Sequence, residues 1–114
     1  MKPEAIVESY LCEQAEILGF LCYKFTSPGH NGVPDRILIG HGTTFFVETK
    51  AVGGKPRKLQ RKVIARINDY GGIAFVASSK HDVDAIFEHI LSQKTSRLRM
   101  HKKWMKELFP LLNK

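Results

Sequence analysis

Apolar residues recur at helical spacing near the start of the chain. Pro3 suits the first turn of a helix, and Gly19 suits the position just after its end. One stripe of this helix is apolar. It consists of Val7, Leu11, Ala15 and Leu18. The pattern predicts a helix over residues 3–18, with the stripe facing the core.

Four short apolar runs predict strands, at residues 20–25, 36–39, 44–50 and 73–77. The segment TSPGHNGV between the first two is rich in Gly, Pro, Asn and Ser, which is typical of a loop. The sequence GHG before residue 43 supplies a tight turn that tolerates positive φ, so the second and third strands form a hairpin. The run IAFVA is wholly apolar, as expected for a strand covered on both faces.

Two further helices follow the hairpin. Pro56 fits the start of one that runs to about residue 70, where Gly71 and Gly72 end it. Its predicted buried stripe is Leu59, Val63, Ile67 and Tyr70. Ser79 and Asp82 resemble a capping box that starts the next helix, which extends to about residue 93. A crossover through the middle helix would place the last strand parallel to its neighbour. The element order predicts an α/β domain with a mixed sheet.

Composition and charge narrow the class of protein. The chain has 114 residues, the size of one compact domain, and a net charge of +7. An excess of positive charge indicates a polyanionic partner, although a solubilising surface has the same composition. The first nine residues lack a signal-peptide pattern, and no apolar run approaches the length of a membrane span. Cys12 and Cys22 are then expected to be reduced thiols, which places the protein in the cytoplasm of a cell.

The composition changes after residue 93. KTSRLRMHKK is basic, and WMKELFPLLNK is apolar enough to form an amphipathic helix that Pro110 disturbs near its end. We therefore expect a domain over residues 1–93 and an extension over 94–114. The extension would pack on the domain or on a second subunit and face nucleic acid with its basic residues.

Acidic and basic residues interrupt the apolar hairpin. Glu48 and Lys50 are two apart on one strand, so their side chains point to the same face. Asp35 begins the antiparallel neighbour and can approach Glu48 across the sheet. Two adjacent carboxylates repel one another unless a cation neutralises them, and Mg²⁺ or Mn²⁺ prefers such oxygen ligands. Lys50 would orient a water or stabilise charge on a phosphate oxygen. The alternative is an exposed hairpin with an ordinary salt bridge.

The segments KFTSPGHNGVPDRILI and FFVETKAVGGKPRKLQ resemble the PD-(D/E)xK nuclease superfamily, in particular its VRR-NUC type in small phage-like form. The resemblance covers roughly residues 4–85. It implies a restriction-endonuclease-like core and metal-dependent cleavage of DNA, with a preference for branched DNA. A domain this small would need a homodimer to cut two strands symmetrically. The alternative is a DNA- or junction-binding module on the same fold that does not cut.

The resemblance also assigns roles to residues. Asp35, Glu48 and the backbone carbonyl of Thr49 would bind Mg²⁺ or Mn²⁺, and Lys50 would be the catalytic lysine. Gln60 matches a glutamine that the family uses after this strand. The family also uses a glutamate of the first helix.

Four glutamates of the first helix are available for that role. Glu8 is the first choice and Glu4 the second, because both border the buried stripe, whereas Glu13 and Glu16 point away from it. Acids in a first turn also stabilise the helix dipole, which is the alternative reading for Glu4 above all.

The remaining polar candidates concern nucleic-acid binding. His30 and Asn31 lie in the loop before the metal site, where they either approach the DNA backbone or belong to a plain loop. Basic residues gather around the start of the second helix, which suits a phosphate. They include Lys55, Arg57, Lys58 and Arg61. The alternative is a charged surface facing solvent.

Overall fold

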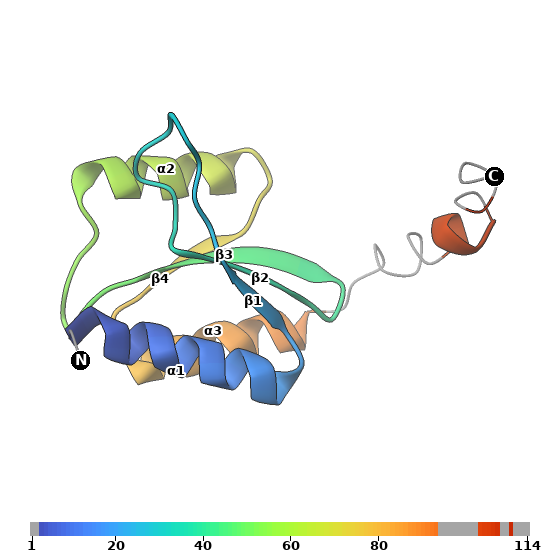
Figure 1. Ribbon diagram of the computed structural model, residues 1–114, viewed down its shortest axis with the longest axis horizontal. Helices are drawn as coiled ribbons and strands as arrows, with labels where there is room; N and C mark the ends of the chain where they lie inside the picture. The colour runs from blue at the N-terminus through green and yellow to red at the C-terminus, as the bar shows by residue number, and fades with distance from the viewer. Residues whose placement is uncertain (1–2, 94–102, 108–109, 111–114) are drawn as a thin grey trace.

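A computed structural model describes residues 3–93, 103–107 and 110 of the chain (Figure 1). Its helices are α1 (Pro3–Leu18), α2 (Lys58–Asp69) and α3 (Lys80–Ser92). Its strands are β1 (Leu21–Lys24), β2 (Arg36–Gly40), β3 (Thr43–Thr49) and β4 (Ala74–Ala77). The predicted element order is confirmed, and the predicted bounds differ from these by two residues at most.

The four strands form one mixed sheet in the order β1-β2-β3-β4. The first three pair antiparallel, whereas β4 lies parallel to β3, as the crossover through α2 requires. The register places Arg36 opposite Val47 and Thr49 opposite Ala77. Asp35, which precedes β2, therefore lies at the same end of the sheet as the end of β3. The α/β class with a mixed sheet is confirmed.

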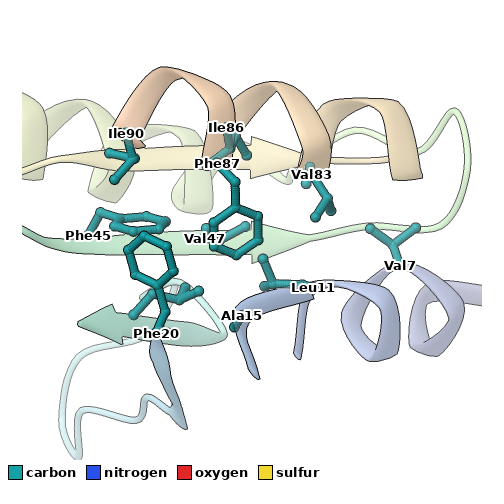
Figure 2. Close-up of a cluster of buried hydrophobic side chains, with 12 residues drawn as sticks. Val7, Leu11, Ala15, Phe20, Phe45, Val47, Val83, Ile86, Phe87 and Ile90 are labelled. Carbon is teal, nitrogen blue, oxygen red and sulfur yellow. The ribbon is translucent and has the colours of Figure 1, made fainter. Parts of the chain in front are cut away.

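The helices lie on both faces of the sheet. Figure 1 shows α1 and α3 on one face and α2 on the other. The core lies between the sheet and the α1–α3 pair, where side chains from all these elements pack together (Figure 2). Its largest members include Leu11, Phe45 and Phe87. Val7, Leu11 and Ala15 are fully buried, which confirms the predicted stripe of the first helix.

The hairpin turn between β2 and β3 has the predicted conformation. His41 and Gly42 have φ values of 52° and 78°, as a two-residue turn of this hand requires. The His41 ring also lies 2.7 Å from the carbonyl oxygen of Leu18, at the end of α1. The turn thus fixes both the hairpin register and the packing of α1 beside it.

The second helix differs from its prediction. It begins at Lys58 rather than Pro56, and two of the residues predicted to be buried are exposed: Leu59 at 50% and Tyr70 at 79%. Its buried residue is Gln60. The reason is that α2 packs mainly against β4, so that only a narrow side of the helix is covered.

The cap of the third helix is also shifted from the predicted capping box. Ser79 Oγ accepts a hydrogen bond from Asp82 N, as predicted, but the Asp82 carboxylate accepts from Ser78 instead of Ser79. These bonds lower the pKa of Asp82, above all the one from the Ser78 backbone amide. At the start of the helix, Ser79 therefore accepts from the backbone amide of Asp82, and Ser78 donates to its carboxylate.

Most of the predicted C-terminal extension lies outside the described residues. Residues 103–107 are helical and exposed. No helix in the described parts of the chain is long and apolar enough to cross a membrane.

The Sγ atoms of Cys12 and Cys22 lie 3.4 Å apart as free thiols in half-buried positions. Burial is the main cause that raises the pKa of Cys22 to about 12.

Candidate functional site

Asp35 is fixed to the last residue of β3. Its Oδ2 accepts hydrogen bonds from Thr49 N at 3.0 Å and from Thr49 Oγ1 at 2.9 Å. Its backbone carbonyl accepts from Phe25 N, which extends the pairing of β1 and β2 by one step. The fully buried Pro34 precedes it. The carboxylate is thus held at the sheet end through one of its two oxygens.

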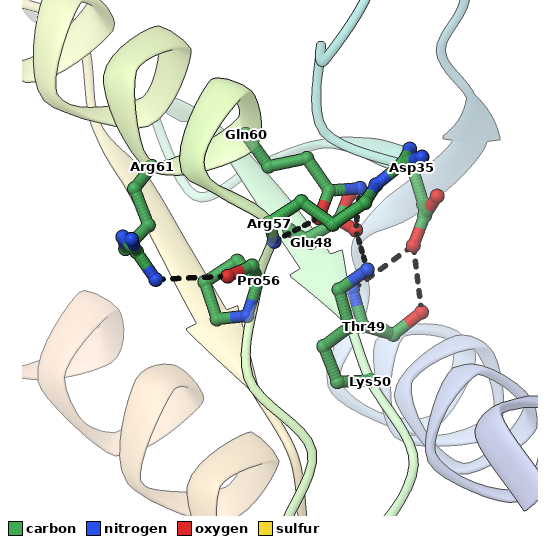
Figure 3. A network of polar contacts seen from close by, with 8 residues as sticks. All are labelled: Asp35, Glu48, Thr49, Lys50, Pro56, Arg57, Gln60 and Arg61. Carbon is green, nitrogen blue, oxygen red and sulfur yellow. Dashed lines mark hydrogen bonds and ion pairs between the residues drawn. The ribbon is translucent and has the colours of Figure 1, made fainter.

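Glu48 is buried, with an exposed fraction of 2%. Its Oε2 accepts a hydrogen bond from Gln60 Nε2 at 2.8 Å and pairs with Lys50 Nζ at 3.0 Å (Figure 3). Its Oε1 is buried as well and has no hydrogen-bond partner within the described residues. An unsatisfied buried carboxylate oxygen is unfavourable, and such an atom in a native fold calls for an explanation.

The pKa of Glu48 is raised. Burial is the largest cause, because it penalises the charged form, and the nearby charge of Asp35 acts in the same direction. The ion pair with Lys50 opposes the shift. The ammonium group of Lys50 therefore does not fully offset the cost of burying the Glu48 carboxylate, and a further positive charge at this position would lower the pKa of Glu48.

Gln60 joins the sheet to the start of α2. Its Oε1 accepts a hydrogen bond from Arg57 N at 2.8 Å, while its Nε2 donates to Glu48. The same amide therefore closes the first turn of the helix and fixes the rotamer of the carboxylate. This arrangement explains why a polar residue is the buried residue of α2.

Glu8 is paired with a basic residue of β2. Its Oε2 forms an ion pair with Arg36 Nε at 2.9 Å, and both side chains are half-buried. The two residues line a cavity of about 360 Å³ with Cys12. The structure thus joins Glu8 to the residue that follows Asp35, through one oxygen of its carboxylate. The side chain of Glu4 lies outside what the structure describes.

The predicted nucleic-acid-binding residues lie at the start of α2 and in the loop before Asp35. Lys55, Arg57, Lys58 and Arg61 are exposed around the start of α2. Arg61 Nη1 donates to the carbonyl oxygen of Pro56. His30 and Asn31 are exposed in the loop before Asp35, and His30 Nδ1 lies 3.3 Å from Ser27 Oγ. In that loop Gly32, at φ 85°, packs so closely on Leu59 that a Cβ would come within 3.0 Å of it.

The donor set fits a hard divalent cation. It offers the second oxygen of Asp35, which is held through Oδ2, and the partnerless Oε1 of Glu48. Across the described chain, no three His, Cys, Asp or Glu side chains gather into a metal-binding group. Mg²⁺ is held in many sites by only one or two carboxylates, with water and substrate as its other ligands, so this small set suits it.

Sequence reasoning missed two features of the site. It named the carbonyl of Thr49 but not its amide and hydroxyl, which anchor Asp35. It also overlooked Arg36, which engages Glu8. A hydroxyl beside the acidic strand residue was the available signal for the first. The pairing of Arg36 with α1 had no local signal, because 28 residues separate the partners.

Two known proteins are similar to this chain, one in sequence and one in structure. The chain is 38% identical over 78 residues to "Putative nuclease p44" of Acyrthosiphon pisum secondary endosymbiont phage 1, and the match covers 68% of this chain and 84% of the relative. It also superposes on a solved VRR_NUC domain with a TM-score of 0.73 and 33% identity, over 78% of this chain and 98% of that domain. No protein-family model matches the chain.

Proposed function

This chain belongs to the VRR-NUC family of nucleases, and on that premise we propose that it is a metal-dependent DNA endonuclease of the PD-(D/E)xK type. Mg²⁺ or Mn²⁺ would be held by Asp35, Glu48 and the backbone carbonyl of Thr49. DNA is the expected substrate because the chain carries a net charge of +7 and exposed basic residues gather around the start of α2, the helix whose Gln60 contacts Glu48.

The observation that carries this proposal is the environment of Glu48. A carboxylate that is 2% exposed, has one oxygen without a hydrogen-bond partner and lies near a second acid is unfavourable for stability. A purely structural role would favour an apolar residue or a fully paired one at this position. A bound cation would satisfy the free oxygen and neutralise the repulsion with Asp35, so the arrangement supports a metal site.

The residues around the proposed metal site would have different roles in the reaction. The cation, when bound, supplies Lewis-acid stabilisation of charge on a phosphate oxygen and a lowered pKa for an attacking water. Gln60 and Thr49 hold the two carboxylates in place. Lys50, with 17% of its side chain exposed, keeps its ammonium at Glu48 and next to the position that a scissile phosphate would take. Glu8, whose carboxylate pairs with Arg36 beside Asp35, would be the glutamate of the first helix that assists these acids.

Incubation of plasmid and branched DNA with the full chain tests the proposed activity. We expect strand cleavage in Mg²⁺ or Mn²⁺ and no cleavage in excess chelator. A module that binds DNA without cutting would shift both substrates in a gel and leave them intact. Binding without cleavage in either metal would therefore contradict the enzymatic assignment.

Mg²⁺ or Mn²⁺ should raise the thermal stability of the protein without DNA. At about 100 times its Kd, a ligand that binds only the folded state stabilises by about 2.7 kcal/mol. For a chain of this size that is on the order of 10 °C in Tm. Differential scanning fluorimetry in EDTA and in each metal measures the shift.

Glu48→Gln should abolish that shift, whereas Glu88→Gln, on an exposed position of α3, should retain it. An equal shift in the Glu48 variant would mean that the cation binds elsewhere on the protein.

We further propose that the enzyme acts on branched DNA as a homodimer, with residues 94–114 as an extension of the domain formed by residues 1–93. Symmetric cleavage of two strands requires two copies of this single site. Sedimentation equilibrium of the full chain should give twice the mass of one chain at micromolar concentration. A monomer that nevertheless cuts both strands of a junction symmetrically would contradict this part of the proposal.

A further inference from the structure

One exposed row of α2 combines three cations with an aromatic ring. The four residues are separated by four positions each, so they lie one above the other along the helix. They are Lys58, Lys62, Arg66 and Tyr70, which follows the last helical residue. All four are exposed. The row begins in the same first turn as Gln60, which contacts Glu48 from the buried side of the helix.

The two lysines of this row, Lys58 and Lys62, do not stabilise the helix. Like charges four residues apart repel each other, and cations near the N-terminus oppose the helix dipole. The first turn of α2 contains no acidic residue, and the single acid of this helix is its last residue, Asp69. A helix that served only to cover the sheet would gain from an acid at the position of Lys58 or Lys62. The row therefore indicates a polyanion lying along the helix.

The far end of the row has a different chemistry. Tyr70 is 79% exposed, compared with 55% for Tyr23 on β1. The guanidinium carbon of Arg66 lies 5.4 Å from the centre of the Tyr70 ring. Such a pair also steadies the end of a helix, but that role does not require the ring to face solvent. A flat aromatic surface beside an arginine is the combination on which unpaired nucleobases stack.

The distance between Gln60 and Tyr70 along α2 indicates how far from the cleavage position a base would meet the ring. Tyr70 follows Gln60 by ten residues, which corresponds to about 15 Å along a helix. A strand whose scissile phosphate lies at Asp35 and Glu48 would pass Lys58 and Lys62 before it reaches the ring. The ring would then meet a base only a few nucleotides from the cleavage position, and the base must be unpaired to stack.

We propose that Arg66 and Tyr70 form a stacking subsite for an unpaired nucleobase, and that Lys58 and Lys62 bind the phosphates between this subsite and the metal site. The inference rests on the proposed nuclease function and specifies its substrate: DNA with a single-stranded segment next to the scissile bond. A fully paired duplex would reach the lysines but leave the ring without a partner.

The test uses the full chain in Ca²⁺ and a duplex with a short single-stranded extension that contains 2-aminopurine, whose fluorescence falls when it stacks. The wild type and Tyr70→Phe should quench this fluorescence. Tyr70→Ala should lose the quenching and bind the extended DNA on the order of tenfold more weakly. Blunt duplex should bind equally to all three. Tyr23→Ala, which removes the other strongly exposed tyrosine, is the matched control and should behave as wild type.

Two results would overturn the subsite. One is unchanged quenching by Tyr70→Ala, and the other is an equal loss of affinity for blunt and extended DNA. Circular dichroism of the variant checks its fold, which an exposed position should not disturb. Plasmid cleavage by the wild type in Mg²⁺ reports on the proposed function separately. Cleavage together with an unaffected Tyr70→Ala variant rejects the subsite alone, whereas no cleavage of any DNA rejects the nuclease assignment.

Discussion

Replacing Glu48 with glutamine should reduce the DNA cleavage rate by about a thousandfold or more and leave DNA binding intact. The side chain keeps its shape, and its amide oxygen can still accept from Gln60, so the first turn of α2 is preserved. The lost negative charge removes a ligand from the proposed cation. Metal stabilisation of the transition state contributes several kcal/mol, and each 1.36 kcal/mol is a factor of ten in rate.

The same substitution should not reduce stability in EDTA. The pKa of Glu48 is higher in the folded than in the unfolded protein because the carboxyl is buried. Such a group contributes stability below its unfolded pKa and loses it as the pH rises through its folded pKa. At neutral pH the charged form is therefore unfavourable without metal. The Tm of Glu48→Gln relative to wild type should rise as the pH increases from the acidic range to neutral.

Asp35→Asn and Glu88→Gln complete this experiment. Asparagine can accept the two bonds from Thr49, so the fold should persist while cleavage is lost as in the Glu48 variant. Glu88 is an exposed glutamate of α3, and its replacement should leave the rate unchanged. Single-turnover cleavage and filter binding in Ca²⁺ measure the two quantities. Wild-type cleavage by either site variant would reject these residues as metal ligands.

Lys50→Ala and Lys50→Arg should each lower the single-turnover rate on the order of a hundredfold, with little change in DNA affinity in Ca²⁺. The ammonium of Lys50 lies 3.0 Å from Glu48 Oε2, with 17% of the side chain exposed, which places it inside the cluster. Loss of one charge-stabilising group in such a site typically costs about 3 kcal/mol. The planar guanidinium of arginine is bulkier than the ammonium group and would be misplaced there.

Lys58→Ala provides the contrasting variant. Lys58 is exposed at the start of α2 and is proposed to bind phosphate. Its removal should weaken binding and lower the salt dependence by about one unit, while the rate at saturating DNA is retained. If Lys50→Ala showed this pattern, or if Lys50→Arg cut normally at saturation, Lys50 would be a phosphate contact and not a catalytic residue.

The amino-acid sequence by itself determined the elements and the grouping of Asp35, Glu48 and Lys50. These features depend on short-range rules. Alternation along a strand puts Glu48 and Lys50 on one face, and a two-residue turn fixes the hairpin register. The same register brings the start of β2 to the end of β3. A family resemblance carried by the same segments was sufficient to anticipate the fold, which the comparison with a solved domain confirms.

Only the tertiary structure decided the hydrogen-bond and ion-pair partners of the acidic side chains. The side of α2 that is buried depends on how the helix packs on the sheet, which the sequence does not show. The apolar stripe was therefore predicted to be buried, whereas Leu59 and Tyr70 are exposed. The same packing brings Gln60 to Glu48 and leaves one carboxylate oxygen without a partner. The ion pair between Glu8 and Arg36 spans 28 residues. No local pattern encodes such contacts, because they form only when separate elements pack together.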